Sequence, residues 1–220
     1  MVLNDGAATE AGVTLAPRTK KQIQTELARH KICDAVVDCL DQFGYAETTI
    51  NRVQERAGVS RGALTHHFPS KEEMMVATME HLLAPVRNPI GANKRPDKRM
   101  DKAGAVERDL LRLWTRMVNT KEGRALVEIL VASRTDTGLY GRIAPSLSKY
   151  DSDFNQEVVK LYRSVDLSDD DVATLWTICR VFLRGLHIQE RFGSGPGQTS
   201  KIMKRFAQII GPHMTMRAPE

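Results

Sequence analysis

The stretch TTINRVQERAGVSRGALTHHF, from Thr48 to Phe68, decides how this chain is organised. It predicts two short helices, Thr49–Ala57 and Ser60–His67, separated by Gly58 and Val59. Gly58 suits a sharp turn because glycine tolerates a positive φ, and the threonine and serine side chains favour N-cap positions. Two short helices joined by a tight turn form a helix-turn-helix, whose second helix enters the major groove of DNA.

Apolar and polar side chains separate to opposite faces of these two helices. The second helix leaves Arg61, Gly62, Thr65 and His66 to face outward. The residues predicted to face the core are Ile50, Val53, Ala57, Val59, Ala63, Leu64 and Phe68. The pattern therefore predicts that the second helix is anchored by one face and presents the other.

The segments on either side of this motif are also helical in pattern. Apolar residues at three- and four-residue spacing predict an amphipathic helix over 20–43, ended by Gly44 in a left-handed conformation. A second helix is predicted from Ser70 to Ala84, with Glu73 completing a capping box. Together these segments predict an N-terminal helix-turn-helix domain.

The rest of the chain is predicted to form a larger helical body, so the fold class is all-α. No alternating strand pattern and no internal repeat is visible. The predicted helices of the body are Asp101–Asn119, Glu122–Arg134, Pro145–Ser164, Ser168–Phe192 and Gln198–Gly211. The predicted division is a disordered tail at 1–17, the helix-turn-helix domain at 18–68, a connecting helix at 69–86, and an effector-binding and dimerisation domain at 87–220, which opens on a Pro-rich charged loop at 87–100.

Composition narrows the class of protein. No apolar run approaches the roughly 20 residues of a membrane span, and the start lacks a secretory signal, so we expect a cytoplasmic protein. The net charge is +5, with a basic excess in and just after the N-terminal third, which favours an anionic partner there. The three cysteines cannot form a disulfide framework and are expected to be small core residues.

The sequence gives no support for an enzyme. It contains no Gly-rich phosphate loop, no GxSxG or HExxH motif, and no Cys/His set with metal-ligand spacing. Asp169–Asp171 follow Ser168 at a predicted helix start, where acidic side chains favour the helix dipole. We therefore predict no catalytic residues, no metal and no cofactor.

The run ICDAVVDCLDQFGYAETTINRVQERAGVSRGALTHHFPSKEEMM, from Ile32 to Met75, closely resembles the DNA-binding domain of the tetracycline-repressor (TetR) family. The resemblance rests above all on Phe43-Gly44-Tyr45, Thr48-Thr49 and the stretch AGVSRGALTHHFPSKEE. The C-terminal two-thirds resembles the family only in being helical, in its length, and in ending with two amphipathic helices. The resemblance implies a DNA-binding transcriptional regulator, most simply a repressor that a small molecule releases.

The resemblance also implies roles for individual residues. Phosphate would be held by Thr48 or Thr49 at the start of the first short helix and by Lys71 at the next helix start. Base edges would be contacted by Arg61 and Gly62. The remaining residues assigned to DNA are Ser60, Thr65, His66 and His67. For Arg61 a solvated helix charge is the alternative, and for the two histidines a structural role.

Thr65 departs from the family pattern, which places a tyrosine at this position. That tyrosine commonly reaches the DNA backbone, and a threonine is too short to do so. Thr65 therefore either touches a thymine methyl group or leaves one phosphate contact absent.

A single reading helix covers few base pairs, so a two-fold dimer on a palindromic double-stranded operator is expected. The last two helices carry broad apolar faces that need cover on two sides. The residues assigned to the dimer interface are Leu175, Ile178, Phe182, Leu186, Ile202, Phe206 and Ile209. Burial of these faces within one chain is the alternative.

The body also offers side chains for an unidentified small-molecule effector. The candidate pocket residues are Trp114, Met117, Val118, Ile129, Leu130, Tyr140, Phe154, Trp176 and Arg180. A basic stripe of Arg180, Arg184, His187 and Arg191 either binds an anionic effector, pairs with acids across the dimer, or is a solvated flank. The alternative function is a ligand-independent nucleoid or cell-division factor on the same scaffold, which a solid core in the body would favour.

Overall fold

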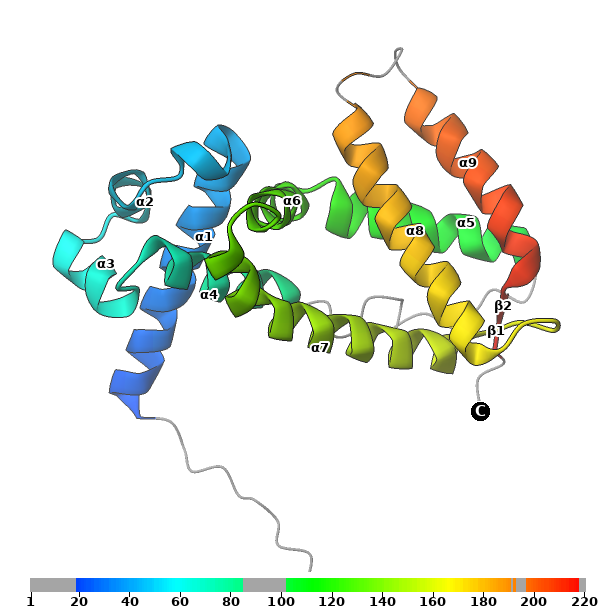
Figure 1. Cartoon of the computed structure of the whole chain (residues 1–220), viewed down its shortest axis with the longest axis horizontal. Helices are drawn as coiled ribbons and strands as arrows, with labels where there is room; N and C mark the ends of the chain where they lie inside the picture. The colour runs from blue at the N-terminus through cyan, green and yellow to red at the C-terminus, as the bar shows by residue number, and fades with distance from the viewer. Residues whose placement is uncertain (1–18, 85–101, 191, 193–196, 218–220) are drawn as a thin grey trace, which may run out of the picture.

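The structure, a computed structural model, describes residues 19–84, 102–190, 192 and 197–217 (Figure 1). These residues are mostly helical, as predicted. The helices are α1 (Lys20–Glu47), α2 (Ile50–Ala57), α3 (Arg61–His67), α4 (Lys71–Leu83), α5 (Lys102–Leu113), the π-helix η2 (Trp114–Val118), α6 (Lys121–Ser133), α7 (Thr137–Leu161), α8 (Asp169–Glu190), α9 (Gln198–Ile210) and the 3₁₀-helix η3 (Gly211–His213). The predicted tail at 1–17 and the predicted loop at 87–100 lie outside the described residues.

The N-terminal unit is built around α1, which carries α2 and α3 on one side (Figure 1). Thr19 begins α1 with a capping box, in which its hydroxyl accepts from Gln22 N and Gln22 Oε1 accepts from Thr19 N. Gly44 has the positive φ expected of it, 75°, but its ψ of 176° is extended, so it breaks α1 without forming the predicted left-handed cap. The helix resumes after this break and continues to Glu47, so its predicted end at Phe43 is a kink.

The helix-turn-helix is anchored by the apolar side chains that the pattern indicated, with one exception. Val53, Leu64 and Phe68 are buried against α1 and α4 in one continuous core. Ala63 is exposed and does not anchor α3, contrary to the prediction. It directly precedes the buried Leu64, and a one-residue step rotates a side chain by about 100° around a helix, so a seven-residue helix buries few positions.

Helix α7 begins earlier than the proline pattern predicted. Asp136 is its N-cap and accepts a hydrogen bond of 2.9 Å from Leu139 N, and Pro145 lies inside the helix. Proline was expected at the first turn because it lacks an N–H donor. The buried positions of α7 repeat at helical spacing through the proline, which explains why packing overrides the local signal. They are Leu139, Ile143, Tyr150, Phe154 and Val158.

A short pair of antiparallel strands departs from the all-helical expectation. Strands β1 (Tyr162–Arg163) and β2 (Thr215–Met216) pair after α7 and after α9. The Arg217 side chain continues this clamp with hydrogen bonds to Val159 O at 2.7 Å and to Asp169 at 2.6 Å. Two-residue strands carry no alternation that a sequence pattern detects. The pair closes the end of the body opposite the N-terminal unit (Figure 1).

A buried carboxylate lies beside this closure. Asp109 on α5 is nearly inaccessible and pairs with Arg108 at 3.3 Å and Arg112 at 3.0 Å. The Tyr162 hydroxyl also donates to it. Burial raises the pKa of Tyr162, and the Asp109 charge adds to that rise, so the phenol stays protonated. The network satisfies a buried charge within the chain.

Helix α6 lies along α1 and joins the body to the N-terminal unit. Three polar contacts connect the helices: Lys121 with Asp38 at 2.9 Å, Arg124 with Asp41 through two bonds, and Glu128 with Tyr45 N at 2.9 Å. All three pairs are separated by 83 residues. Because the separation is constant, successive turns of α1 meet successive turns of α6 in one register. We call these contacts the α1–α6 ladder.

Candidate nucleic-acid interface

Two hydroxyl caps set the geometry of the helix-turn-helix. Thr49 Oγ1 accepts from Arg52 N at 3.3 Å to begin α2, and Ser60 Oγ accepts from Ala63 N at 3.1 Å to begin α3. Gly58 between them has φ 60° and donates to the carbonyls at the end of α2. Both predicted caps and the predicted left-handed turn are confirmed. Thr48, the alternative cap, is buried and donates instead to Gly44 O at 2.7 Å.

One face of α3 is open to solvent. Arg61, Gly62, Thr65 and His66 are all exposed, whereas Leu64 on the opposite face is fully buried. Apart from its chain neighbours and the backbone of its own helix, no atom of the described residues lies within 4 Å of the position of a Cβ at Gly62. The Thr65 hydroxyl donates back to Arg61 O at 2.9 Å, so its polar atom is engaged by the helix. The exposed face therefore combines one guanidinium, one imidazole and, at Gly62, a backbone that no side chain covers.

The end of α3 is held by α1. Arg29 donates to His67 O at 3.2 Å and its guanidinium lies 4.6 Å from the centre of the Phe68 ring. Partial burial lowers the pKa of His67, and the neighbouring charges of His66 and Arg29 lower it further. His67 is therefore a neutral side chain at pH 7, whereas His66 beside it is exposed.

Lys71 is already engaged within the chain. Its Nζ donates to Tyr45 O at 2.8 Å and lies 4.4 Å from the centre of the Tyr45 ring. Burial lowers the pKa of Lys71. The contact fixes the ammonium at the C-terminal end of α1, where carbonyl groups favour a cation. It positions Lys71 beside the helix-turn-helix instead of in open solvent.

Sequence reasoning missed three residues at this interface. Arg29 and Tyr45 position His67 and Lys71, and both contacts join residues far apart in the chain that no periodic pattern links. Arg52 was passed over although it lies three residues after Thr49 on α2 and its backbone N–H donates to that cap. It is partly exposed, pairs with Glu47 at 3.1 Å and lies over the Phe43 ring at 4.6 Å.

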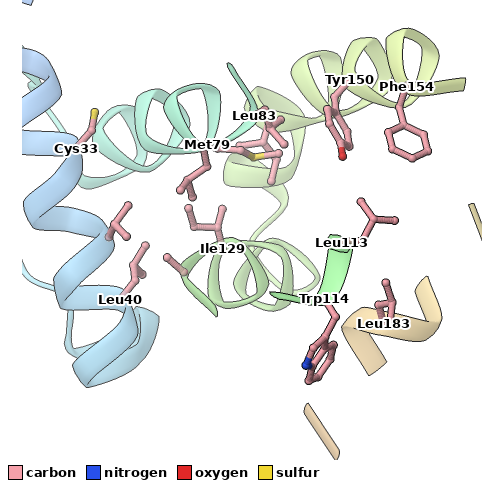
Figure 2. Close-up of a cluster of buried hydrophobic side chains, with 14 of the residues drawn as sticks. Cys33, Leu40, Met79, Leu83, Leu113, Trp114, Ile129, Tyr150, Phe154 and Leu183 are labelled. Atoms are coloured by element: carbon pink, nitrogen blue, oxygen red, sulfur yellow. The ribbon is translucent and has the colours of Figure 1, made fainter. Parts of the chain in front are cut away.

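The candidate pocket residues do not all come together. Trp114 on η2 and Phe154 on α7 are both buried but lie apart (Figure 2). The Arg180 guanidinium on α8 lies 4.1 Å from the Phe154 ring centre. Met117, Val118 and Leu130 are half-buried. Ile129 is buried in the part of the core next to α1 and α4, and Trp176 packs on Tyr162 at 4.9 Å.

Tyr140 is a poor candidate for a pocket wall because 59% of its surface is exposed. The buried face of α7 passes through Leu139 and Ile143, so the next residue along points about 100° away. Its aromatic side chain was assigned to a pocket by residue type before the start of α7 was known.

A cavity of about 390 Å³ opens where α5, η2 and the end of α8 meet the start of α9. Trp114, Leu186 and Met203 supply apolar walls, and Gln189, Glu190 and Ser200 supply polar ones. The volume lies in the range that accommodates small ligands.

The residues assigned to a dimer interface divide between two environments. Ile178 and Ile209 are exposed, with 47% and 60% of their surfaces accessible, and the neighbouring Val181 and Ile188 are exposed as well. Leu186 is buried within the chain, while Leu175 and Ile202 are half-buried. Phe182 of α8 stacks on Phe206 of α9 with ring centres 3.8 Å apart. The last two helices thus share an internal contact and leave an apolar strip on α8 uncovered.

Two kinds of feature are absent from the described residues. None of their helices is both long and apolar enough to cross a bilayer. Nor do these residues group three or more His, Cys, Asp or Glu side chains as a metal site would.

Comparisons with known proteins agree on the N-terminal unit. Residues 32–78 match the family model of bacterial regulatory proteins, tetR family. Over 80 residues the chain is 34% identical to the HTH-type transcriptional regulator BetI of Burkholderia cenocepacia, a match covering 34% of this chain and 41% of BetI. BetI of Paraburkholderia xenovorans is 40% identical over 58 residues, covering 26% and 30% of the two chains. The chain therefore matches less than half the length of these relatives.

Solved structures extend the similarity to the body. A TetR-family transcriptional regulator from Rhodococcus sp. superposes with a TM-score of 0.62 at 18% identity, covering 84% of this chain and 99% of that one. A transcriptional regulator from Saccharomonospora viridis, solved in complex with choline, gives a TM-score of 0.56 at 17% identity, covering 87% and 100%. At these identities the likeness concerns the fold, an N-terminal helix-turn-helix domain with a larger helical domain. Motif and sequence match therefore place residues 32–78 with the tetR family of bacterial regulatory proteins, while the body shares only the fold of the solved structures.

Proposed function

We propose that this chain is a cytoplasmic transcriptional regulator, a homodimer that represses by binding a palindromic operator and is released by a small molecule. The observation that carries the proposal is the exposed face of α3, where Arg61, Gly62, Thr65 and His66 stand clear of the body. A helix buried on one side and polar on the other is the element that enters a major groove.

In this proposal each residue of α3 has a distinct task. Arg61 bonds a guanine through its planar guanidinium, and Gly62 lets the backbone approach the bases. Because the Thr65 hydroxyl is engaged with Arg61 O, its methyl group is the part that contacts a thymine methyl. His66 contacts DNA beside it, and the neutral His67 lies at the rim.

Phosphate is held at the flanks of the reading helix. The N-terminal N–H groups of α2, beginning at Thr49, and of α3, beginning at Ser60, point at the backbone of the duplex. Lys71 adds a fixed charge because Tyr45 O holds its ammonium in place. These contacts set the register of the protein on DNA, while base recognition falls to α3.

The dimer interface in this proposal is the uncovered face of α8 with the adjoining part of α9. Ile178, Val181 and Ile188 lie on one side of α8 and are exposed in the single chain. Gly185 lies among them, and outside its own helix no described residue comes within 4 Å of where a Cβ would stand, which permits close helix approach. Two copies related by a two-fold axis would bury this strip against itself.

In this proposal, effector binding in the body acts on the helix-turn-helix domain through the helices that connect them. The proposed domains are 18–68 for DNA and 87–220 for effector and dimer, joined by the helix at 69–86. The cavity of about 390 Å³ favours a ligand-responsive regulator over a ligand-independent nucleoid or division factor. Motion of α4 and α6, which both contact α1, would change the spacing of the two reading helices. The choline of the Saccharomonospora protein is a ligand of that protein, and its chemistry need not apply here.

A mobility-shift assay tests the proposal on DNA upstream of the gene that encodes the chain. The Arg61→Ala variant is expected to lose preference for that DNA over random duplex, since a bidentate base contact is worth about 1–3 kcal/mol of discrimination. Arg142→Ala removes an exposed guanidinium from α7 and serves as the matched control. If Arg61→Ala weakens specific and random DNA equally, its assigned role is wrong; if the parent protein binds neither, the regulator proposal fails.

A further inference from the structure

Helix α8 carries a row of hydrogen-bond donors that the described part of the chain does not fully satisfy. Among the described residues, Arg180 Nε and Trp176 Nε1 are buried and have no acceptor. Arg184, one turn beyond Arg180, is partly buried and makes no ion pair or hydrogen bond within the described part of the chain. Buried donors without acceptors are uncommon in folded proteins and call for an explanation.

The charge around this row is unbalanced. Arg180 is 7% exposed and pairs with Asp151 at 2.7 Å, the one carboxylate that acts on both guanidinium groups. Asp151 itself is largely in solvent. Burial lowers the pKa of Arg184, and the charge of Arg180 adds to that effect. Two guanidinium groups therefore share one exposed carboxylate at the edge between α7 and α8.

The aromatic side chains nearby are already occupied by a cation. The Arg180 guanidinium lies 4.1 Å from the Phe154 ring centre and 5.5 Å from that of Tyr150. A quaternary ammonium is recognised by open aromatic faces without a competing positive charge. Both rings point toward Leu113 and Leu183, so apolar side chains continue from this site into the body (Figure 2).

We propose that the effector is an organic anion, a carboxylate with an apolar body, whose acidic group is held by Arg180 and Arg184. The planar guanidinium fork matches a carboxylate, and Arg180 bonds Asp151 through one nitrogen only, which leaves its Nε unsatisfied. The apolar part lies along Tyr150 and Phe154. This inference rests on the proposed function, because it names the chemical class of the molecule that relieves repression.

The contacts of Arg180 also favour an anionic effector over the two other interpretations of the basic stripe, which are a solvated flank and ion pairs across the dimer. A solvated flank does not have a guanidinium at 7% exposure. Arg180 already has an ion pair with Asp151 of its own chain, so no acid of a second subunit is needed to pair its charge. His187, further along the stripe, packs its ring 6.1 Å from that of Trp114 within the same chain. Arg191 lies outside the described residues.

The test uses the full chain and the fluorescent anion 8-anilinonaphthalene-1-sulfonate, with no DNA present. Octanoate is expected to displace this probe at least tenfold more effectively than octanol or octyltrimethylammonium, which have the same chain length. Arg184→Gln is expected to weaken binding of the probe and of octanoate at least tenfold. Arg142→Gln, the same change at an exposed site on α7, should alter both by less than twofold. Arg184→Lys, which keeps the charge, should recover part of the loss.

Circular dichroism and light scattering verify that each variant is folded and dimeric. Displacement by octyltrimethylammonium as strong as by octanoate, or equal anion binding by Arg184→Gln and the parent, would overturn the inference. So would an Arg184→Gln protein that becomes monomeric with unchanged anion affinity. The assay contains no DNA, so its result is independent of operator binding. A protein that binds its operator but no anion would refute only the proposed effector class. A protein that binds the anion but no operator would refute only the proposed regulatory function.

Discussion

The carboxylate of Glu128 on α6 accepts a hydrogen bond of 2.9 Å from the backbone N–H of Tyr45, at the break in α1 that Gly44 creates. A Cβ at Gly44 would lie 3.2 Å from the same carboxylate. The body of the protein thus satisfies a backbone donor at the edge of the helix-turn-helix. This contact is the last rung of the α1–α6 ladder.

Replacing Glu128 by alanine should separate the two units energetically. The bond joins a charged acceptor to a partly buried N–H, so its loss is expected to cost about 1.5–3 kcal/mol. The melting temperature should fall by roughly 3–10 °C for a chain of this size. Differential scanning calorimetry gives the result, with Glu122→Ala on the exposed side of α6 as the control. Equal melting temperatures for the two variants would refute the assigned importance of this rung.

Lys71→Ala should weaken binding to all DNA, without regard to sequence. If its ammonium neutralises one phosphate, the slope of log affinity against log salt should fall by about 0.9. Fluorescence anisotropy at several salt concentrations measures this slope. Lys149→Ala, an exposed lysine on α7 paired with Asp153, should leave it unchanged. An unaltered slope for Lys71→Ala would mean that this lysine contacts Tyr45 but no phosphate.

Gly185→Arg should produce a folded monomer. The position has open space in the single chain, so a side chain there does not disturb the monomer core. At the proposed interface the same side chain would place a charge inside an apolar contact. Light scattering coupled to gel filtration distinguishes the two states, and Gly141→Arg provides an equally open glycine on α7. If Gly185→Arg forms a dimer of unchanged stability, the dimer interface does not include this face of α8.

Gly123→Ala and Gly141→Ala should change stability in opposite directions. A Cβ at Gly123 would lie 2.2 Å from Val118 O and 2.3 Å from Met117 O, which forces the junction of η2 and α6 apart. We expect a loss of about 1–3 kcal/mol there. At Gly141 the space is open, and alanine should stabilise the helix by roughly 0.5–1 kcal/mol. Urea unfolding of both variants checks the signs.

The three cysteines should not react in the native protein. Cys33, Cys39 and Cys179 are buried, and burial raises the pKa of each thiol, that of Cys179 to about 12. A thiol with a raised pKa holds little of the reactive thiolate at pH 8. Titration with Ellman's reagent should therefore detect close to none without denaturant and all three in guanidinium chloride. Rapid reaction in the native state would contradict the core assignment.

Local signals predicted the helix-turn-helix well because its determinants are local. The Thr49 and Ser60 caps and the Gly58 turn each depend on residues within a few positions along the chain. The predicted capping box at Ser70 is only half formed, because Ser70 Oγ accepts from Glu73 N while the Glu73 carboxylate faces Arg142 across the chain.

The long-range features could not be predicted in the same way. Lys71 was assigned to phosphate from resemblance alone, and its bond to Tyr45 O spans 26 residues. Tyr140 was assigned by residue type, although the phase of α7 turns it outward. The β1–β2 pair and the α1–α6 ladder join segments far apart in the chain, which periodicity within one helix does not reveal. Packing between helices decides such contacts.

The shared register of α1 and α6 constrains how such regulators are recombined. A chimaera that grafts a foreign N-terminal unit onto this body keeps Lys121, Arg124 and Glu128. It loses the two aspartates that pair with them and the break at Gly44 that leaves the Tyr45 amide free for Glu128. Insertion of a single residue in α6 would rotate the ladder by about 100° and disconnect every rung beyond it. A transplantable DNA-reading module of this architecture therefore includes one face of a helix that lies 83 residues downstream.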